Sequence, residues 1–242
     1  MRDLVIAYCG PAAIPDGFWT RWNTDPLLIA ALFGLALLVH RSHVGNRRAG
    51  WAAIGVLFLT FVSPLCALSS ALFSARVLHH VLLVAAAAPL LALAFPSRRL
   101  GALPLGLLVG AHAVVMWAWH TPPAYSWGLA SVPAYWLMQA TLLGSAWLLW
   151  RGIFAPAAAN GMAYMALGAT IFQMGLLGAL IVFAPYPLYA EHFTSTDPWG
   201  LHPLADQQLA GLLMWVPAML PYVAVAIRLA WTGLRGAGAQ AT

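Results

Sequence analysis

Residues 77–95 read VLHHVLLVAAAAPLLALAF, an apolar run without a single Asp, Glu, Lys or Arg and with two histidines near its start. A helix that crosses a membrane needs about 20 consecutive, mostly apolar residues, and this run has that length. The whole chain of 242 residues has the same character, because 62% of it is hydrophobic and only 7% is charged. An average soluble domain has about 25% charged residues and uses them to cover its surface. The sequence therefore predicts an integral membrane protein.

Several other apolar runs of similar length predict a polytopic, all-α membrane bundle of seven transmembrane helices. The expected spans are residues 24–41, 50–72, 77–95, 101–120, 134–153, 161–184 and 207–231. Because these runs fill one compact bundle, we expect residues 1–242 to form a single transmembrane domain. Prolines inside three spans predict kinks, since proline lacks the N–H group that a helix interior uses. These prolines are Pro64, Pro89 and Pro217.

The arginines predict the orientation of the bundle, since the chain contains no lysine. With seven spans, one side receives Arg41, Arg47, Arg48, Arg98, Arg99, Arg151, Arg228 and Arg235. The other side receives Arg2, Arg21, Arg76 and the acidic residues Asp3, Asp16, Asp25, Glu191, Asp197 and Asp206. Cytoplasmic loops of membrane proteins carry the excess of positive charge. We therefore expect the N-terminus outside and the C-terminus in the cytoplasm.

Composition and motifs exclude several classes of function. The net charge of +5 comes from arginines scattered between apolar runs, without the basic stripe that nucleic-acid-binding proteins have. Two cysteines are too few for a disulfide framework. The sequence has no phosphate-binding glycine loop, no GxSxG motif and no spaced CxxC pair. Since no acid–base pair or nucleophile is arranged for catalysis, we expect that the protein is not an enzyme.

Side chains that bind soft metals are expected to gather at the outer ends of several spans. His79 and His80 lie in the first turn of one span, His120 ends the next, and Asp206 precedes the last. The full set of candidate metal ligands is His80, His120, Asp206, His79, Cys9, His112, Met116 and Met214. Ionisable residues within a membrane are costly and indicate function. Imidazole and sulfur ligands suit copper, especially Cu(I), so copper is the expected metal.

Several of these candidates have structural alternatives. Asp206 is a metal ligand, an acceptor that fixes an imidazole tautomer, or a cap for the last span. Cys9 has no role, forms a disulfide with Cys66, or binds a soft metal. Packing is the alternative for the two methionines. The adjacent histidines point about 100° apart on a helix, so one ring faces the bundle while the other faces a neighbour or the interface.

Three stretches, VLHHVLLVAAAAPLL (77–91), WAWHTPPAY (117–125) and PLADQQLAGLLMW (203–215), resemble the CtaG-type cytochrome c oxidase assembly factors. The opening AYCGPAAIP, followed by RWNTDPLL, resembles a bacterial subgroup of that family. Its members are seven-span membrane proteins with their metal-handling face outside. The resemblance places the family's histidines on His80 and His120 and its aspartate on Asp206. Arg76 stands where many members have a further histidine.

The resemblance implies a membrane assembly factor for a haem–copper cytochrome c oxidase in a bacterial cell (inner) membrane. We expect it to bind copper at the outer face and to support copper delivery to the oxidase as a metallochaperone. Expected partners are the oxidase subunits, other copper chaperones, the lipid bilayer and a second copy of the chain, but not nucleic acid. Two alternatives stay open. One is a haem- or quinone-binding oxidoreductase with His80 and His120 as axial ligands, and the other is a copper transporter.

Overall fold

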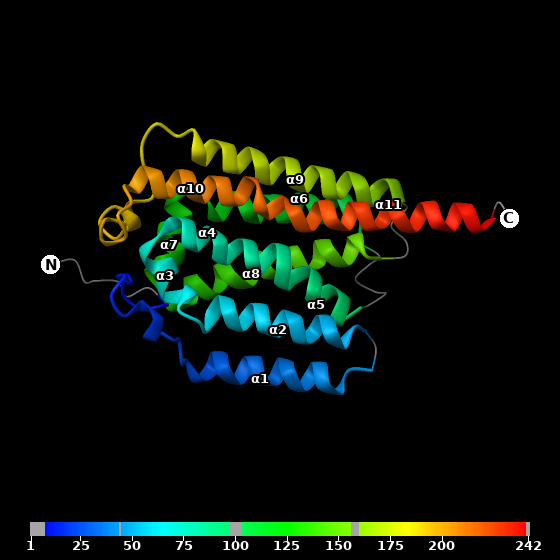
Figure 1. Cartoon of the computed structure of the whole chain (residues 1–242), viewed down its shortest axis with the longest axis horizontal. Coiled ribbons are helices and arrows are strands. Elements are labelled where there is room, and N and C mark those ends of the chain that lie inside the picture. The colour runs from blue at the N-terminus through cyan, green and yellow to red at the C-terminus, as the bar shows by residue number, and fades with distance from the viewer. Residues whose placement is uncertain (1–7, 44, 97–102, 156–159, 241–242) are drawn as a thin grey trace.

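The computed structural model describes residues 8–43, 45–96, 103–155 and 160–240, and the regular elements in these ranges are all helices. The longer helices lie roughly side by side in one elongated bundle (Figure 1). The prediction of an all-α fold is therefore confirmed. The first described residues lie at one end of the bundle, and α11 (Leu220–Gln240) extends from the other (Figure 1). We call these the N-terminal end and the C-terminal end of the bundle.

The first part of the chain forms α1 (Pro26–Arg41), α2 (Arg47–Phe61) and α3 (Leu65–Ala71). α1 begins where the Asp25 side chain accepts a hydrogen bond of 2.8 Å from the backbone N–H of Leu27. The predicted span 50–72 is not one straight helix, because α2 and α3 are bent by 43°. Pro64 lies in the break between them, so the kink predicted there is confirmed.

A central helix runs from Phe73 to Ala94 through α4 (Phe73–Val81), the π-helical segment η2 (Leu82–Ala87) and α5 (Ala88–Ala94). It starts four residues before the predicted span 77–95. Pro89 has no N–H group to donate to the preceding turn, and the chain widens into the π-helical segment just before it. Small alanine side chains let this segment pack closely against α2 and α8 (Val132–Ile153).

The remaining elements complete the bundle. They are η1 (Phe18–Thr20), α6 (Leu105–Trp119), α7 (Pro122–Ala130), α8, α9 (Asn160–Val182), η4 (Ala190–His192), η5 (Asp197–Trp199), α10 (Pro203–Trp215), η6 (Pro217–Met219) and α11. The helix from α10 to α11 is interrupted only by η6, which contains the predicted kink residue Pro217. The short helix α7 was not predicted from the sequence.

In the part of the chain that the structure describes, three helices are long and apolar enough to cross a membrane, namely Phe73–Ala94, Gly161–Val182 and Pro203–Arg235. The bent pair α2–α3 brings this number to four if it counts as one span. α1 and α6 are apolar but shorter. These helices support a membrane protein with three to four candidate spans, and the number of seven stays a prediction.

α9 and α10 approach each other closely through glycines. A Cβ atom on Gly178 would lie 2.9 Å from the backbone oxygen of Gly211, which is too close for any side chain. α10 also packs against α4. The start of α10, which carries Asp206, is therefore held between two neighbouring helices.

The two ends of the bundle differ in charge among the described residues. α1 ends and α2 begins at the C-terminal end, which places Arg41 and Arg47 there (Figure 1). Asp25 and Asp206 lie at the N-terminal end, at the starts of α1 and α10. Arg2, Asp3, Arg98 and Arg99 lie outside the described residues.

Candidate functional site

Three histidines and a glutamine form a buried polar cluster inside the bundle. α4 carries His79 and His80, His120 directly follows α6, and Gln139 lies on α8. The ring centroid of His80 is 5.9 Å from that of His79 and 5.8 Å from that of His120. All four side chains are buried. We call them the histidine cluster, and it brings together three of the residues singled out in the sequence.

His120 is held in one tautomer by the backbone of its own helix. Its Nδ1 lies 2.7 Å from the carbonyl oxygen of Met116. Because a carbonyl oxygen only accepts, Nδ1 carries the proton in the neutral ring and Nε2 carries the lone pair. Nε2 is buried and has no hydrogen-bond partner among the described residues. Histidines that bind metals commonly have this arrangement, with one nitrogen anchored and the other presenting its lone pair.

His80 presents a second bare nitrogen. Its Nε2 lies 3.3 Å from the side-chain nitrogen of Gln139, while its Nδ1 has no partner in the described structure. The amide oxygen of Gln139 has no partner either. A rotation of the amide exchanges its oxygen and nitrogen, and Nε2–H of His80 then donates to that oxygen. In this rotated orientation the lone pair of His80 is on Nδ1. In the unrotated orientation Nε2 accepts from the amide nitrogen and Nδ1 carries the proton.

The separation of the two rings suits one shared metal ion. Bonds between imidazole nitrogens and a metal are about 2 Å long, so two rings with centroids 5.8 Å apart can hold one ion between them. No group of three or more His, Cys, Asp or Glu side chains within the described ranges could hold a metal. A metal bound here therefore has two imidazole ligands from this chain.

His79 lies beside this pair. Its ring meets the ring of Phe61 edge to face, with centroids 4.9 Å apart. Both ring nitrogens are buried and without a hydrogen-bond partner in the part of the chain that the structure describes. Such bare polar atoms are rare in folded proteins and often mark a water, ion or ligand that belongs at the position. The prediction that one of the two adjacent rings faces a neighbour agrees with the contact to Phe61.

Asp206 binds the backbone at the start of α4. Its carboxylate accepts hydrogen bonds from the backbone N–H of Phe73 (2.6 Å) and Ser74 (3.2 Å), and also from the Ser74 hydroxyl group. It therefore caps the start of α4 from the neighbouring helix α10, and the helix dipole of α4 favours this negative charge. The role of Asp206 as a metal ligand stays a prediction. The alternative role as a cap of the last span is wrong as to the helix, because the carboxylate caps α4.

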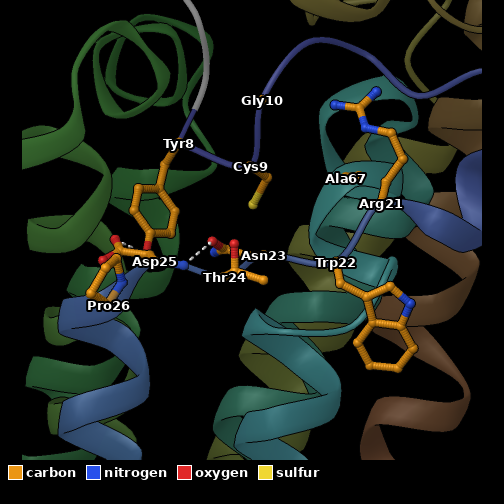
Figure 2. Close-up of a pocket in the computed structure, with 10 residues that line it drawn as sticks. All are labelled: Tyr8, Cys9, Gly10, Arg21, Trp22, Asn23, Thr24, Asp25, Pro26 and Ala67. Atoms are coloured by element: carbon orange, nitrogen blue, oxygen red, sulfur yellow. Dashed lines mark hydrogen bonds between the residues drawn. The ribbon is translucent and has the colours of Figure 1, made fainter.

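Cys9 forms a disulfide with Cys66, with the two Cα atoms 5.2 Å apart. A cysteine in a disulfide has no thiolate to offer a metal, so the ligand prediction for Cys9 is corrected in favour of the disulfide alternative. Cys9 lines a hollow of about 440 Å³ at the N-terminal end, together with Asn23 and Asp25 (Figure 2). The phenol of Tyr8 donates a hydrogen bond of 2.6 Å to Asp25 across this hollow (Figure 2).

The three deeper candidates are buried but lie outside the histidine cluster. Nδ1 of His112 is 3.0 Å from the hydroxyl oxygen of Ser145, and its Nε2 has no partner among the described groups. Met116 contributes its backbone oxygen to His120, and its side chain is buried. Met214 is also buried, on α10. The ligand roles of the two methionines stay predictions.

Two polar residues near the cluster were not among the predicted ligands. Gln139 is a single amide within an apolar helix, and nothing in its spacing marks it. Arg76 lies one turn before His80 on α4 and is completely buried. Its guanidinium carbon lies 5.4 Å from the ring centroid of Tyr135. In the sequence it lies between the predicted spans 50–72 and 77–95, and the signal that could have identified it was its position where many members of the CtaG-type family have a further histidine.

The segment 189–195 covers the N-terminal end of the cluster region. The Tyr189 hydroxyl group donates to the backbone oxygen of His120 (2.8 Å). Nε2 of His192 lies 2.6 Å from the hydroxyl oxygen of Tyr125, and its Nδ1 lies 3.2 Å from the backbone oxygen of Ala71. Burial lowers the pKa of His192 to about 4, so this ring is neutral at physiological pH. The segment is therefore a well-anchored cover.

Fold and site together define a class: a helical membrane protein with a buried polar cluster of three histidines and a glutamine in its bundle. The sequence model of the Caa3_CtaG family, described as cytochrome c oxidase caa3 assembly factor, matches residues 31–235. The chain belongs to this family. No curated protein and no solved structure matches the chain. The match confirms the resemblance found in the sequence and implies the oxidase as the partner of this protein.

Proposed function

We propose that the chain crosses the membrane of a bacterial cell seven times, with its N-terminal end outside. Two observations support this. Disulfides persist in oxidising compartments outside the cytoplasm, and Cys9–Cys66 joins two segments at the N-terminal end. Arginines at the C-terminal end, such as Arg41 and Arg47, agree with a cytoplasmic side. The shorter helices α1 and α6 cross by local thinning of the bilayer or by interfacial anchoring.

We propose further that this oxidase assembly factor binds one Cu(I) ion between His80 and His120. The observation that carries this proposal is the pair of bare, buried imidazole nitrogens on rings 5.8 Å apart. A buried polar atom without a partner costs free energy, and a soft metal ion offsets that cost by using both lone pairs. Neutral imidazoles need no deprotonation before they bind the metal.

The anchors around the two rings suit a carrier more than a catalyst. The Met116 carbonyl and the Gln139 amide hold the orientations of the two rings without a metal. With only two protein ligands, the ion keeps open coordination positions for a ligand from a partner protein. Ligand exchange with an oxidase subunit then transfers the ion without chemical conversion of a substrate. We therefore propose a non-enzymatic metallochaperone role.

The proposal is tested by titrating purified full-length protein in nanodiscs with Cu(I) against a chromogenic chelator under reducing conditions. The wild type is expected to bind one copper ion per chain, and His80→Ala and His120→Ala are expected to lose it. His43→Ala, a change at an exposed histidine, is the matched control and should bind as the wild type does. The copper content of the oxidase is then measured in membranes of cells carrying each variant.

Two results contradict the proposal. One is a protein that binds no Cu(I) while both histidine variants mature the oxidase normally. The other is a Soret band in the purified protein, which favours the haem-binding alternative. Copper uptake by vesicles that contain only this protein would favour the transporter alternative.

A further inference from the structure

Arg76 is a cation enclosed completely by protein. Its relative exposure is 0%, and its Nε and both Nη atoms form no hydrogen bond of regular geometry with the described residues. Its neighbours are the Tyr125 and Tyr135 phenols, and its guanidinium carbon lies 5.4 Å from the Tyr135 ring centroid. Arg151, also buried, donates to the backbone oxygen of Phe95 (2.8 Å) and lies over the Trp147 ring. A buried charge without an opposite charge is strongly unfavourable, and proteins normally pair it. Neutral phenols do not balance the charge of Arg76, and no carboxylate among the described residues pairs with it.

The neighbouring groups do not supply this charge. Asp206 binds the backbone of Phe73 and Ser74 at the start of the same helix, and its carboxylate is used there. The Tyr125 and Tyr135 phenols are the hydrogen-bonding neighbours of Arg76, and the imidazoles of His79, His80 and His192 also lie near it. None of these side chains is a carboxylate. Burial raises the pKa of the Tyr125 phenol above its usual value, so a phenolate does not form beside the guanidinium.

We propose that Arg76 binds a small monovalent anion, such as chloride or formate, inside the bundle beside the histidine cluster. One guanidinium balances one negative charge, and its N–H groups all donate. His79 has two bare ring nitrogens on the next turn of the helix, and one of them supplies an N–H donor to the same ligand. Because Arg76 is fully enclosed, the ligand is small, and a phosphate ester or a peptide carboxylate does not reach it. The anion is expected to bind Arg76 in the copper-free protein as well, so this proposal does not depend on copper binding.

The test measures binding of radiolabelled chloride by equilibrium dialysis, using copper-free, full-length protein in nanodiscs in gluconate buffer. The wild type is expected to bind one chloride per chain. Unlabelled bromide and formate should displace it, while sulfate should not. Arg76→Gln is expected to weaken chloride binding at least tenfold, and Arg76→Lys, which keeps the charge, is expected to retain it. Arg48→Gln removes an exposed arginine and should bind as the wild type does.

A second variant keeps the test decisive if Arg76→Gln fails to fold. Arg76→Met removes the charge with a side chain of similar length, and replacing a buried charge by an apolar group is commonly tolerated. It should fold and bind no chloride. A wild type that binds no chloride overturns the proposal. So does chloride binding that persists in the folded Met or Gln variant. These outcomes are independent of copper, since His120→Ala is expected to keep the chloride site.

Discussion

The carboxylate of Asp206 on α10 accepts a hydrogen bond from the backbone N–H of Phe73, the first residue of α4, with 2.6 Å between nitrogen and oxygen. A carboxylate from one helix thus satisfies the free N–H groups at the start of another, where a side chain of the same helix usually does so. This contact fixes the first turn of α4 beside α10. His79 and His80 lie on the second turn of α4, so their position depends on this cap.

Asp206→Ala is expected to destabilise the protein strongly. It leaves the buried N–H groups of Phe73 and Ser74 without an acceptor, at a cost of about 3 kcal/mol. Thermal unfolding in nanodiscs measures the loss, and Asp206→Asn should lose less because it keeps one acceptor oxygen. Asp197→Ala, at an exposed acid, is the control. An Asp206→Ala protein as stable as this control would contradict the capping role.

Gln139→Leu is expected to weaken Cu(I) binding without removing either imidazole. The amide anchors His80, and loss of such a supporting partner typically lowers metal affinity about 10–100-fold. The competition titration measures this change. Gln208→Leu, on the exposed side of α10, is the matched control. Equal affinities in the two variants would show that the amide does not orient a ligand.

Arg76→His is expected to tighten Cu(I) binding. Residues four apart share one face of a helix, so the new imidazole lies one turn from His80 and adds a third ligand. A tenfold gain, about 1.4 kcal/mol, is the expected lower bound. The same variant should bind no chloride. Unchanged copper affinity would place the metal away from this face of α4.

The Cys9–Cys66 disulfide is expected to contribute about 2–4 kcal/mol, because it closes a loop with a sequence separation of 57 residues. Cys9→Ser, Cys66→Ser and the double variant should show the same fall in unfolding temperature, since each removes the same bond. A double variant much less stable than either single variant would mean that the thiols contribute separately.

His192 is expected to make stability depend on pH. Its pKa is about 4 in the folded protein and about 6.5 when exposed, so the unfolded chain binds a proton first as pH falls. The contribution is complete above pH 6.5 and is lost between pH 6.5 and pH 4, by up to about 3 kcal/mol. His192→Gln should flatten this part of the unfolding profile, whereas His43→Gln should not. A profile unchanged by His192→Gln would contradict the assignment.

The helical class and the helix positions were predictable because apolar runs are local features of the sequence. A break between α3 and α4 was predicted by the gap between the expected spans 50–72 and 77–95, but its exact position was not. Leu72, the last residue of the expected span, adopts an extended conformation (φ −118°, ψ 131°), and α4 begins directly after it at Phe73. The carboxylate of Asp206 stabilises this arrangement from a helix far away in the sequence. Such a tertiary contact leaves no periodic signal.

The site was predictable in part for the same reason. His80 and His120 stand out as ionisable residues in apolar runs, and the bundle brings their rings together. The role of Asp206 depends on which neighbour its side chain meets, and spacing does not reveal that. Cys9 lies in a segment without helical periodicity, so its pairing with Cys66 was one of three open alternatives.

The covalent tie between the segment before α1 and α3 also constrains how the protein is made. Its two sulfurs lie before α1 and in α3, so α1 and α2 separate them in the chain. With the outward orientation proposed above, the bond closes only after α1 and α2 have been inserted and both cysteines have reached the oxidising side. Maturation of this assembly factor would then depend on thiol oxidation outside the cytoplasm.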